Sequence, residues 1–255
     1  MNQIISAKKK ILEASFRAKE GHIASAFSIM NLIYVLINNS FIFNDKRYLN
    51  NFILSKGHGC LAYYALLNEF KIISDNVFKS YCNYSSILGG HPDRNKSKYF
   101  TASTGSLGHG LPIIVGMGLA DKISNKKNNY FIIMGDQECN EGTLWESLLL
   151  LNHHKINNLT IIIDRNYSRE DDLNLGKLNN KLKDFSKLIY TINGHDNVQI
   201  KKTLLKNNYT EQPKIIIAKT LKGYGSKILE NDLSWHHRFP SSNLELDKLK
   251  KSITK

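Results

Sequence analysis

Short runs of hydrophobic residues, bounded by polar turn residues, alternate along this 255-residue chain with longer segments of helical periodicity. Runs of that length are typical of buried strands, whereas apolar residues spaced three or four apart indicate helices. Strands that alternate with helices predict a parallel, doubly wound α/β sheet flanked by helices. We expect strands at residues 51–54, 130–134, 159–163, 188–192 and 214–218, and helices at 3–20, 28–37, 61–70, 111–124, 143–155 and 198–206.

The length and composition fit one domain over residues 1–255, because the chain can bury a full core and shows no repeat or low-complexity linker. The most apolar stretch, residues 24–43, is interrupted by polar residues, which favours a buried helix over a membrane span. Three scattered cysteines without paired spacing, and no signal-peptide pattern, predict a reduced, cytoplasmic setting.

The net charge of +13 would suit a nucleic-acid-binding protein, but only six of the 35 basic residues are arginine. Nucleic-acid-binding proteins rely on arginine for bidentate contacts to bases and phosphates. The lysines here are dispersed, so a solvated surface facing an anionic ligand or an acidic partner is the favoured interpretation. We expect neither nucleic acid nor a membrane as a partner.

Residues 130–166 read as one strand–helix–strand unit of about the usual ~30 residues. Its strands must run parallel, so Asp136 and Asn166 leave adjacent strands at the same carboxyl edge, where open α/β sheets bind ligands. Each residue alone could belong to an ordinary turn. Together, a carboxylate and an amide oxygen suit Mg²⁺, which completes its coordination with water and phosphate oxygens. The pair therefore predicts a metal-bound phosphate compound.

Two further features point to a polar pocket. A glycine-rich loop, residues 104–110, precedes a helix and could bring backbone N–H groups to a ligand, although tight helix packing would explain it equally well. His22, His58 and His91 each lie beside glycine; a lone histidine of this kind is usually a surface residue, but three suggest groups that move protons near neutral pH. No histidine or cysteine spacing indicates zinc.

Taken together, these motifs resemble the N-terminal, diphosphate-binding part of transketolase over nearly the whole chain. The matching segments are GHIAS (21–25), LSKGH (54–58), GGHPDR (89–94), STGSLGHG (103–110), the Gly-Asp…Asn thiamine diphosphate signature (135–166), NGHD (193–196), KTLKGYG (219–225) and WHHRFP (235–240). The chain ends where a full-length transketolase would continue, so it resembles the N-terminal subunit of a split transketolase.

The resemblance implies thiamine diphosphate and Mg²⁺ as cofactors. Metal ligands would be Asp136, Asn166 and the backbone carbonyl of Ser168. Cofactor contacts would come from His58, Gly105, Ser106, Leu107, Gly108, Gly135, Asp136, Gln137, Asn166 and His236. The catalytic histidines around the sugar would be His22, His58, His91 and His236.

The implied activity is transfer of a two-carbon ketol unit from a ketose or its phosphate to an aldose or its phosphate. A C-terminal subunit carrying the pyrimidine-binding domain, and the glutamate that activates the cofactor, would complete the enzyme. Two copies of each chain would form a heterotetramer, with Glu141 and Glu146 at the subunit interface.

The chain departs from the family pattern at Gln137, where a glycine normally follows Gly-Asp, and in residues 167–170. Ala24 also replaces a common glycine. These departures keep open a catalytically weakened scaffold or regulatory subunit. Within the same chemistry, the alternative is part of a related synthase or decarboxylase that acts on another 2-oxo compound, but the histidine-rich loops favour a polyhydroxylated sugar.

Overall fold

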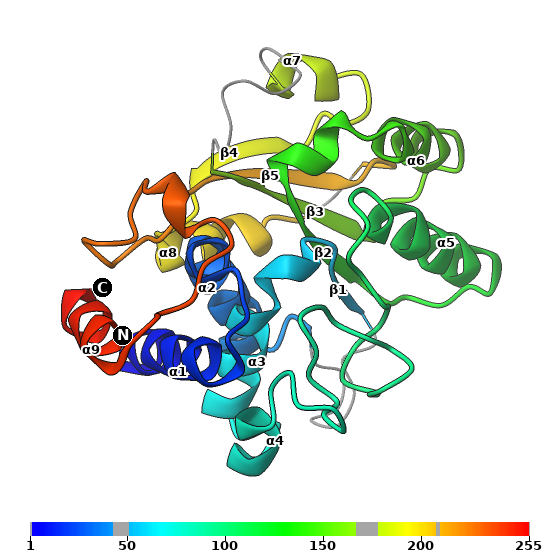
Figure 1. Cartoon of the computed structure of the whole chain (residues 1–255). Helices are drawn as coiled ribbons and strands as arrows, with labels where there is room; N and C mark the ends of the chain where they lie inside the picture. Colours follow the sequence, from blue (N-terminus) through cyan, green and yellow to red (C-terminus); the bar gives the residue numbers. More distant parts are fainter. Residues whose placement is uncertain (1, 43–50, 167–177, 208–209, 255) are drawn as a thin grey trace.

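A parallel sheet forms the centre of the computed structural model, which describes residues 2–42, 51–166, 178–207 and 210–254 (Figure 1). Within these residues the sheet has five strands in the order β1-β2-β3-β5-β4, every neighbouring pair parallel. The strands are β1 (Phe52–Leu54), β2 (Tyr130–Gly135), β3 (Leu159–Arg165), β4 (Ile189–Asn193) and β5 (Lys214–Lys219).

Helices cover both faces of the sheet, as Figure 1 shows. Alternate residues of each strand point to opposite faces, so Phe131 and Ile133 of β2 join one apolar core, whereas Ile132 and Met134 join the other. The first core includes α1 (Asn2–Ala18), α2 (Ile23–Asn38), α3 (Cys60–Glu69), α8 (Asn197–Leu204) and α9 (Asn243–Ser252). The second includes α5 (Gly110–Ile123), α6 (Gly142–His153) and α7 (Leu178–Leu182). The predicted doubly wound α/β fold is confirmed.

The five predicted strands and most predicted helices are confirmed to within about two residues. One boundary was wrong: the helix expected at 28–37 begins at Ile23. Small residues explain the difference, because Ala24, Ser25 and Ala26 are buried and let this first turn pack inside the core. The sequence pattern also missed α7, α9 and the short α4 (Asp75–Lys79).

The strand register explains how the site is assembled. Gly135 of β2 pairs with Asp164 of β3, and Asp164 pairs with Ala218 of β5. Polar segments that follow β1, β2, β3 and β5 therefore meet at one carboxyl edge. Within the described parts of the chain, no helix combines the length and apolarity needed to cross a bilayer.

Candidate functional site

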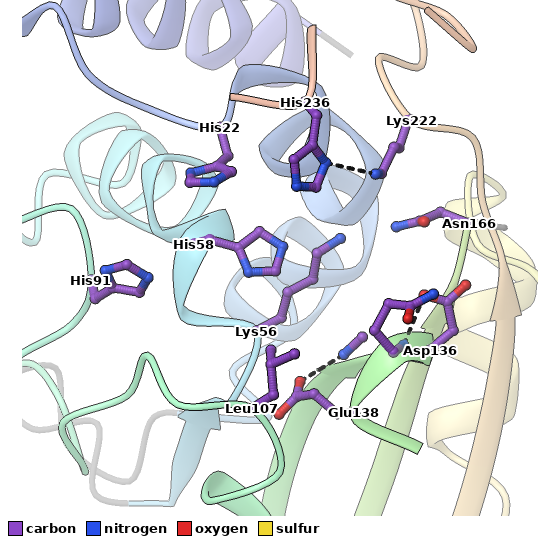
Figure 2. Close-up of a pocket in the computed structure, with 12 residues that line it drawn as sticks. His22, Lys56, His58, His91, Leu107, Asp136, Glu138, Asn166, Lys222 and His236 are labelled. Atoms are coloured by element: carbon purple, nitrogen blue, oxygen red, sulfur yellow. Dashed lines mark hydrogen bonds between the residues drawn. The ribbon is translucent and has the colours of Figure 1, made fainter. Parts of the chain in front are cut away.

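A cavity of about 500 Å³ opens at the carboxyl edge of the sheet (Figure 2). Residues that lie far apart in the sequence meet there, because many of them follow a strand or precede a helix at that edge, whereas His91 comes from the loop between α4 and α5. The lining residues are His22, Lys56, His58, His91, Leu107, Gly135, Asp136, Gln137, Glu138, Asn166, Lys222 and His236.

Asp136 and Asn166 supply oxygen atoms to one corner of this cavity (Figure 2). Asp136 follows β2, and its Oδ1 accepts a hydrogen bond from the Gln137 backbone N–H over 3.0 Å. Asn166 is buried, and its Nδ2 donates to Asp164 Oδ2 over 2.9 Å. Its Oδ1 has no hydrogen-bond partner among the described residues. A buried, unpartnered amide oxygen beside a carboxylate fits a hard cation such as Mg²⁺.

Asp164 is the buried anion behind this corner. The Lys56 ammonium lies 2.5 Å from Asp164 Oδ2, and both side chains are almost fully excluded from solvent. Ser28 Oγ donates to the same carboxylate over 2.8 Å, and Thr220 Oγ1 donates to Asp164 Oδ1. Burial opposes ionisation of Asp164, but Lys56 and these hydroxyls outweigh it, so its pKa is lowered. The carboxylate therefore stays ionised and can orient its neighbours.

Histidines form the opposite wall of the cavity (Figure 2). The His22 ring centroid lies 5.1 Å from that of His58 and 5.6 Å from that of His236. Burial, followed by the charge of Lys56, lowers the pKa of His58 to about 2. Burial, followed by repulsion from neighbouring histidines, lowers the pKa of His22 to about 4, and burial also lowers that of His91. These three rings are therefore neutral at pH 7 and can both donate and accept hydrogen bonds.

Lys222 enters the cavity from the loop after β5. Its Nζ lies 3.0 Å from His236 Nδ1, across which a proton can be shared. The loop is held by His195, whose Nε2 accepts from the Leu221 backbone N–H over 2.8 Å and whose ring stacks on Tyr224 with 3.5 Å between centroids. A cation is thus fixed at the edge where an anionic ligand would lie.

Glu138 joins three of the loops that shape the cavity. Its buried carboxylate accepts from the backbone N–H groups of Gly135 at 2.8 Å and Gly108 at 3.0 Å, and from Ser55 Oγ. Burial raises its pKa despite these hydrogen bonds. Gly108 has φ +80°, and a Cβ there would collide with Thr143 Oγ1, so the glycine-rich loop can approach only without a side chain.

The sequence-predicted residues divide into two groups by position. Nine line the cavity: His22, His58, His91, Leu107, Gly135, Asp136, Gln137, Asn166 and His236. Gly105, Ser106 and Gly108 lie in the adjoining loop but outside the lining. Glu141 and Glu146, at the start of α6, are partly and largely exposed away from the cavity. Ser168 falls outside the described residues.

Sequence reasoning overlooked Lys56 and Lys222 as site residues, although both line the cavity. Each lies inside one of the matching motifs, LSKGH and KTLKGYG. They could have been identified from their positions, because each follows a predicted strand at the ligand-binding edge. They did not stand out because lysines are dispersed along the whole chain, which by itself indicates only a charged surface.

Fold and cavity together define an α/β protein that can hold a cation and an anionic, phosphate-like ligand at the carboxyl edge of a parallel sheet. The model of the family "Transketolase, thiamine diphosphate binding domain" matches residues 2–253. The chain belongs to this family. The predicted relationship to transketolase is therefore confirmed, as is the prediction of a transferase of the transketolase type.

Two curated relatives support this family assignment. The chain is 34% identical to an apulose-4-phosphate transketolase subunit of Actinobacillus succinogenes over 89% of this chain and 85% of the relative. It is 31% identical to the protein of the same name from Phocaeicola vulgatus, over 92% of this chain and 87% of the relative.

Solved structures show the same fold in a longer protein. Transketolase from Leishmania mexicana superposes with a TM-score of 0.82 at 23% identity, covering 99% of this chain but 41% of that one. Transketolase from Campylobacter jejuni gives a TM-score of 0.82 at 23% identity, covering 98% and 41%. The chain therefore spans about two fifths of these full-length transketolases.

Proposed function

We propose that this chain is the diphosphate-binding subunit of a two-chain transketolase, which transfers a two-carbon ketol unit from a ketose phosphate to an aldose phosphate. The observation that carries the proposal is the buried Oδ1 of Asn166, which has no hydrogen-bond partner in the described part of the chain and lines the cavity with Asp136. The relatives named for apulose-4-phosphate transketolase make apulose 4-phosphate the first ketose to test.

In this proposal Asp136 and Asn166 bind Mg²⁺ through side-chain oxygens, and the Ser168 carbonyl, outside the described residues, completes the protein ligands. His58 and His236 contact the diphosphate of thiamine diphosphate, and the loop that contains Leu107 borders the cofactor. Lys222 offsets negative charge at the same edge of the cavity, which favours a phosphate group there.

Bound thiamine diphosphate supplies the electron sink that allows a carbon–carbon bond beside a carbonyl to break. The protein residues then have to hold the sugar and move protons. His22, His58 and His91 are neutral, so each can donate a hydrogen bond to a sugar hydroxyl through one ring nitrogen and accept one through the other. The contact between Lys222 and His236 provides a further position where a proton can be exchanged.

The partner in this proposal is a separate C-terminal chain with the pyrimidine-binding domain and the cofactor-activating glutamate, while residues 1–255 act as one diphosphate-binding domain in the cytoplasm. The names of the two curated relatives describe each as one subunit of a transketolase, which supports a second chain. Glu141 and Glu146 are exposed enough to meet it, and two copies of each chain would give the expected heterotetramer.

The test is a ketol-transfer assay with this chain, its candidate C-terminal partner, thiamine diphosphate and Mg²⁺. Apulose 4-phosphate and other ketose phosphates are offered with an aldose phosphate acceptor, and products are resolved by mass spectrometry. We expect an acceptor lengthened by two carbons only when both chains are present. An intact complex that binds the cofactor but lengthens no acceptor would contradict the proposed activity.

A catalytically weakened scaffold is the second candidate, and Gln137 is the observation that favours it. Gln137 lines the cavity at the position where the family pattern has glycine. A side chain there takes up space next to the proposed metal ligand Asp136. Retained complex formation with no cofactor binding would favour this alternative.

A further inference from the structure

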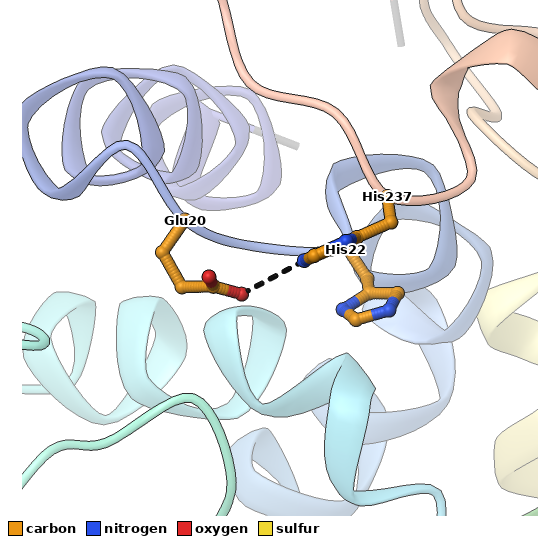
Figure 3. Close-up of side chains that lie close together, drawn as sticks. All are labelled: Glu20, His22 and His237. Carbon is orange, nitrogen blue, oxygen red and sulfur yellow. Dashed lines mark hydrogen bonds and ion pairs between the residues drawn. The ribbon is translucent and has the colours of Figure 1, made fainter.

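A second group of potential metal ligands consists of Glu20, His22 and His237 (Figure 3). His22 also lines the cavity, across from Asp136 and Asn166 (Figure 2). Glu20, His22 and His237 each offer one ligand atom, and these atoms all lie within 4.8 Å of one another. His237 Nε2 is 3.1 Å from Glu20 Oε1, and the ring centroids of His22 and His237 are 4.5 Å apart.

The backbone holds Glu20 and His22 in place. Gly21 has φ +129°, which places it in a turn between α1 and α2, and its N–H donates to Glu20 Oε1 over 3.0 Å. A Cβ at Gly21 would come within 2.7 Å of Leu61, so this turn requires glycine. The carboxylate and the imidazole are therefore presented from one tight turn.

His237 arrives from the other end of the chain, shortly after η3 (Leu233–Trp235). Trp235 is buried, and the guanidinium of Arg238 lies 4.2 Å from its ring centroid, which anchors the segment on both sides of His237. The side chain of His237 remains 58% exposed and that of Glu20 39% exposed, so both can adjust to a ligand.

One carboxylate and two imidazoles form a donor set that suits Zn²⁺ and leaves a fourth position open for water or substrate. Tetrahedral zinc places its ligand atoms roughly 3.3 Å apart, given bonds of about 2.0–2.1 Å. The 3.1 Å between His237 Nε2 and Glu20 Oε1 already meets this distance, and small rotations of these two exposed side chains would close the longer separations, which are at most 4.8 Å. His22 is already neutral because burial lowers its pKa, so it need lose no proton to coordinate.

We propose that Glu20, His22 and His237 form a binding site for a transition-metal dication, for which Zn²⁺ is the probe ion. Mg²⁺ does not compete well here, because it prefers oxygen ligands and gives up its water reluctantly. The two sites thus differ in donor chemistry: the first offers oxygen atoms, and the second mainly nitrogen atoms.

Occupation of this site has a functional consequence that rests on the proposed function. Zn²⁺ would engage a lone pair of His22 and remove that ring from proton exchange with the sugar. Zinc would therefore inhibit ketol transfer while leaving the Mg²⁺ site intact.

Zinc binding is tested first, on the chain itself, by competition with a chromogenic zinc chelator. The variants are Glu20→Gln and His237→Asn, and the control is His153→Asn, which breaks the histidine pair of α6. We expect the affinity for one Zn²⁺ to fall at least tenfold in each site variant and to stay unchanged in the control. Equal affinity in all four proteins, or loss only in the control, would overturn the site.

Cobalt provides a second readout that needs no activity. Co²⁺ bound by this donor set should give the visible absorption of a tetrahedral or five-coordinate ion, and His237→Asn should abolish it. A purely octahedral spectrum that is unchanged in His237→Asn would contradict coordination by these residues.

The inhibitory role is tested separately in the two-chain assembly, with Mg²⁺ in excess. Zinc should inhibit the unmodified assembly at least tenfold more strongly than the His237→Asn assembly. Equal inhibition would overturn the inhibitory role. An assembly that shows no ketol transfer would contradict the proposed function instead, since the zinc and cobalt titrations are independent of it.

Discussion

Asp164 fixes the orientation of Asn166: the Asn166 amide nitrogen donates to Asp164 Oδ2 over 2.9 Å, which turns the amide oxygen away from this partner. That oxygen is buried, has no hydrogen-bond partner within the residues that the structure describes, and is the atom that we assign to the metal. Lys56, Ser28 and Thr220 bind the same carboxylate. A residue outside the cavity lining thus arranges the ligand set inside it.

Asp164→Asn should therefore destabilise the fold and disturb the site together. The substitution leaves the buried Lys56 ammonium without its anion, and breaking a buried pair in this way costs about 3–5 kcal/mol. Urea unfolding of the variant measures the loss, with the exposed Asp247→Asn on α9 as the control, which should change little. Equal stability of Asp164→Asn and the control would contradict the role of Asp164.

Gly108→Ala and Gly116→Ala should have opposite effects on stability. Alanine at 108 would keep a positive φ and press a Cβ against Thr143, which costs about 2–4 kcal/mol. Gly116 lies on the exposed face of α5, and among the described residues no atom beyond its chain neighbours and its own helix backbone lies within 4 Å of the position that a Cβ would take. Alanine there should therefore stabilise the helix by up to about 1 kcal/mol. Thermal and urea unfolding should rank the two variants on either side of the unmodified chain; the reverse order would be inconsistent with the close approach at Gly108.

Acid should destabilise the chain partly through His58. Its pKa is about 2 in the folded protein and about 6.5 when unfolded. Below pH 6.5 the unfolded chain binds a proton that the folded chain does not, so stability falls as pH falls. When the pH is lowered from 6.5 to 5, the free energy of unfolding of His58→Asn should fall by about 1–2 kcal/mol less than that of the unmodified chain, as measured by urea unfolding. His153→Asn, on the exposed side of α6, serves as control, and identical pH profiles for all three proteins would rule out this contribution.

Gln137→Gly should preserve or tighten thiamine diphosphate binding in the two-chain assembly. The substitution removes a side chain from the cavity next to Asp136 and restores the close backbone approach of the family pattern. Calorimetric titration of the cofactor in Mg²⁺ provides the comparison. A large loss of affinity would mean instead that the glutamine side chain is itself a ligand.

Much of this architecture could be predicted from the order of residues. The strand–helix–strand spacing predicts that Asp136 and Asn166 leave neighbouring parallel strands, and the pairing of Gly135 with Asp164 confirms it. Strong apolar runs also predict the remaining strands. By contrast, α9 was missed because its two buried leucines, Leu246 and Leu249, lie among charged residues, so the helical periodicity of apolar residues is weak there.

The parts that could not be predicted depend on tertiary contacts. Asp164 lies one residue before the end of β3, and no local pattern shows that Lys56 and Thr220 converge on it. In the same way, Glu20 and His237 meet across almost the whole chain, so no spacing rule for metal ligands applies to them. Lys222 could have been found from its motif, but its contact with His236 needs the folded loop.

In the function that we propose, Asp136 and Asn166 form the metal corner of a thiamine diphosphate site. The decisive experiment is calorimetric titration of thiamine diphosphate into this chain with its candidate C-terminal partner, with and without Mg²⁺. Asp136→Ala and the chain alone are the controls. We predict saturable binding that requires Mg²⁺, the partner and Asp136, with at least a tenfold loss in Asp136→Ala. Unchanged affinity in a folded Asp136→Ala assembly would contradict the claim.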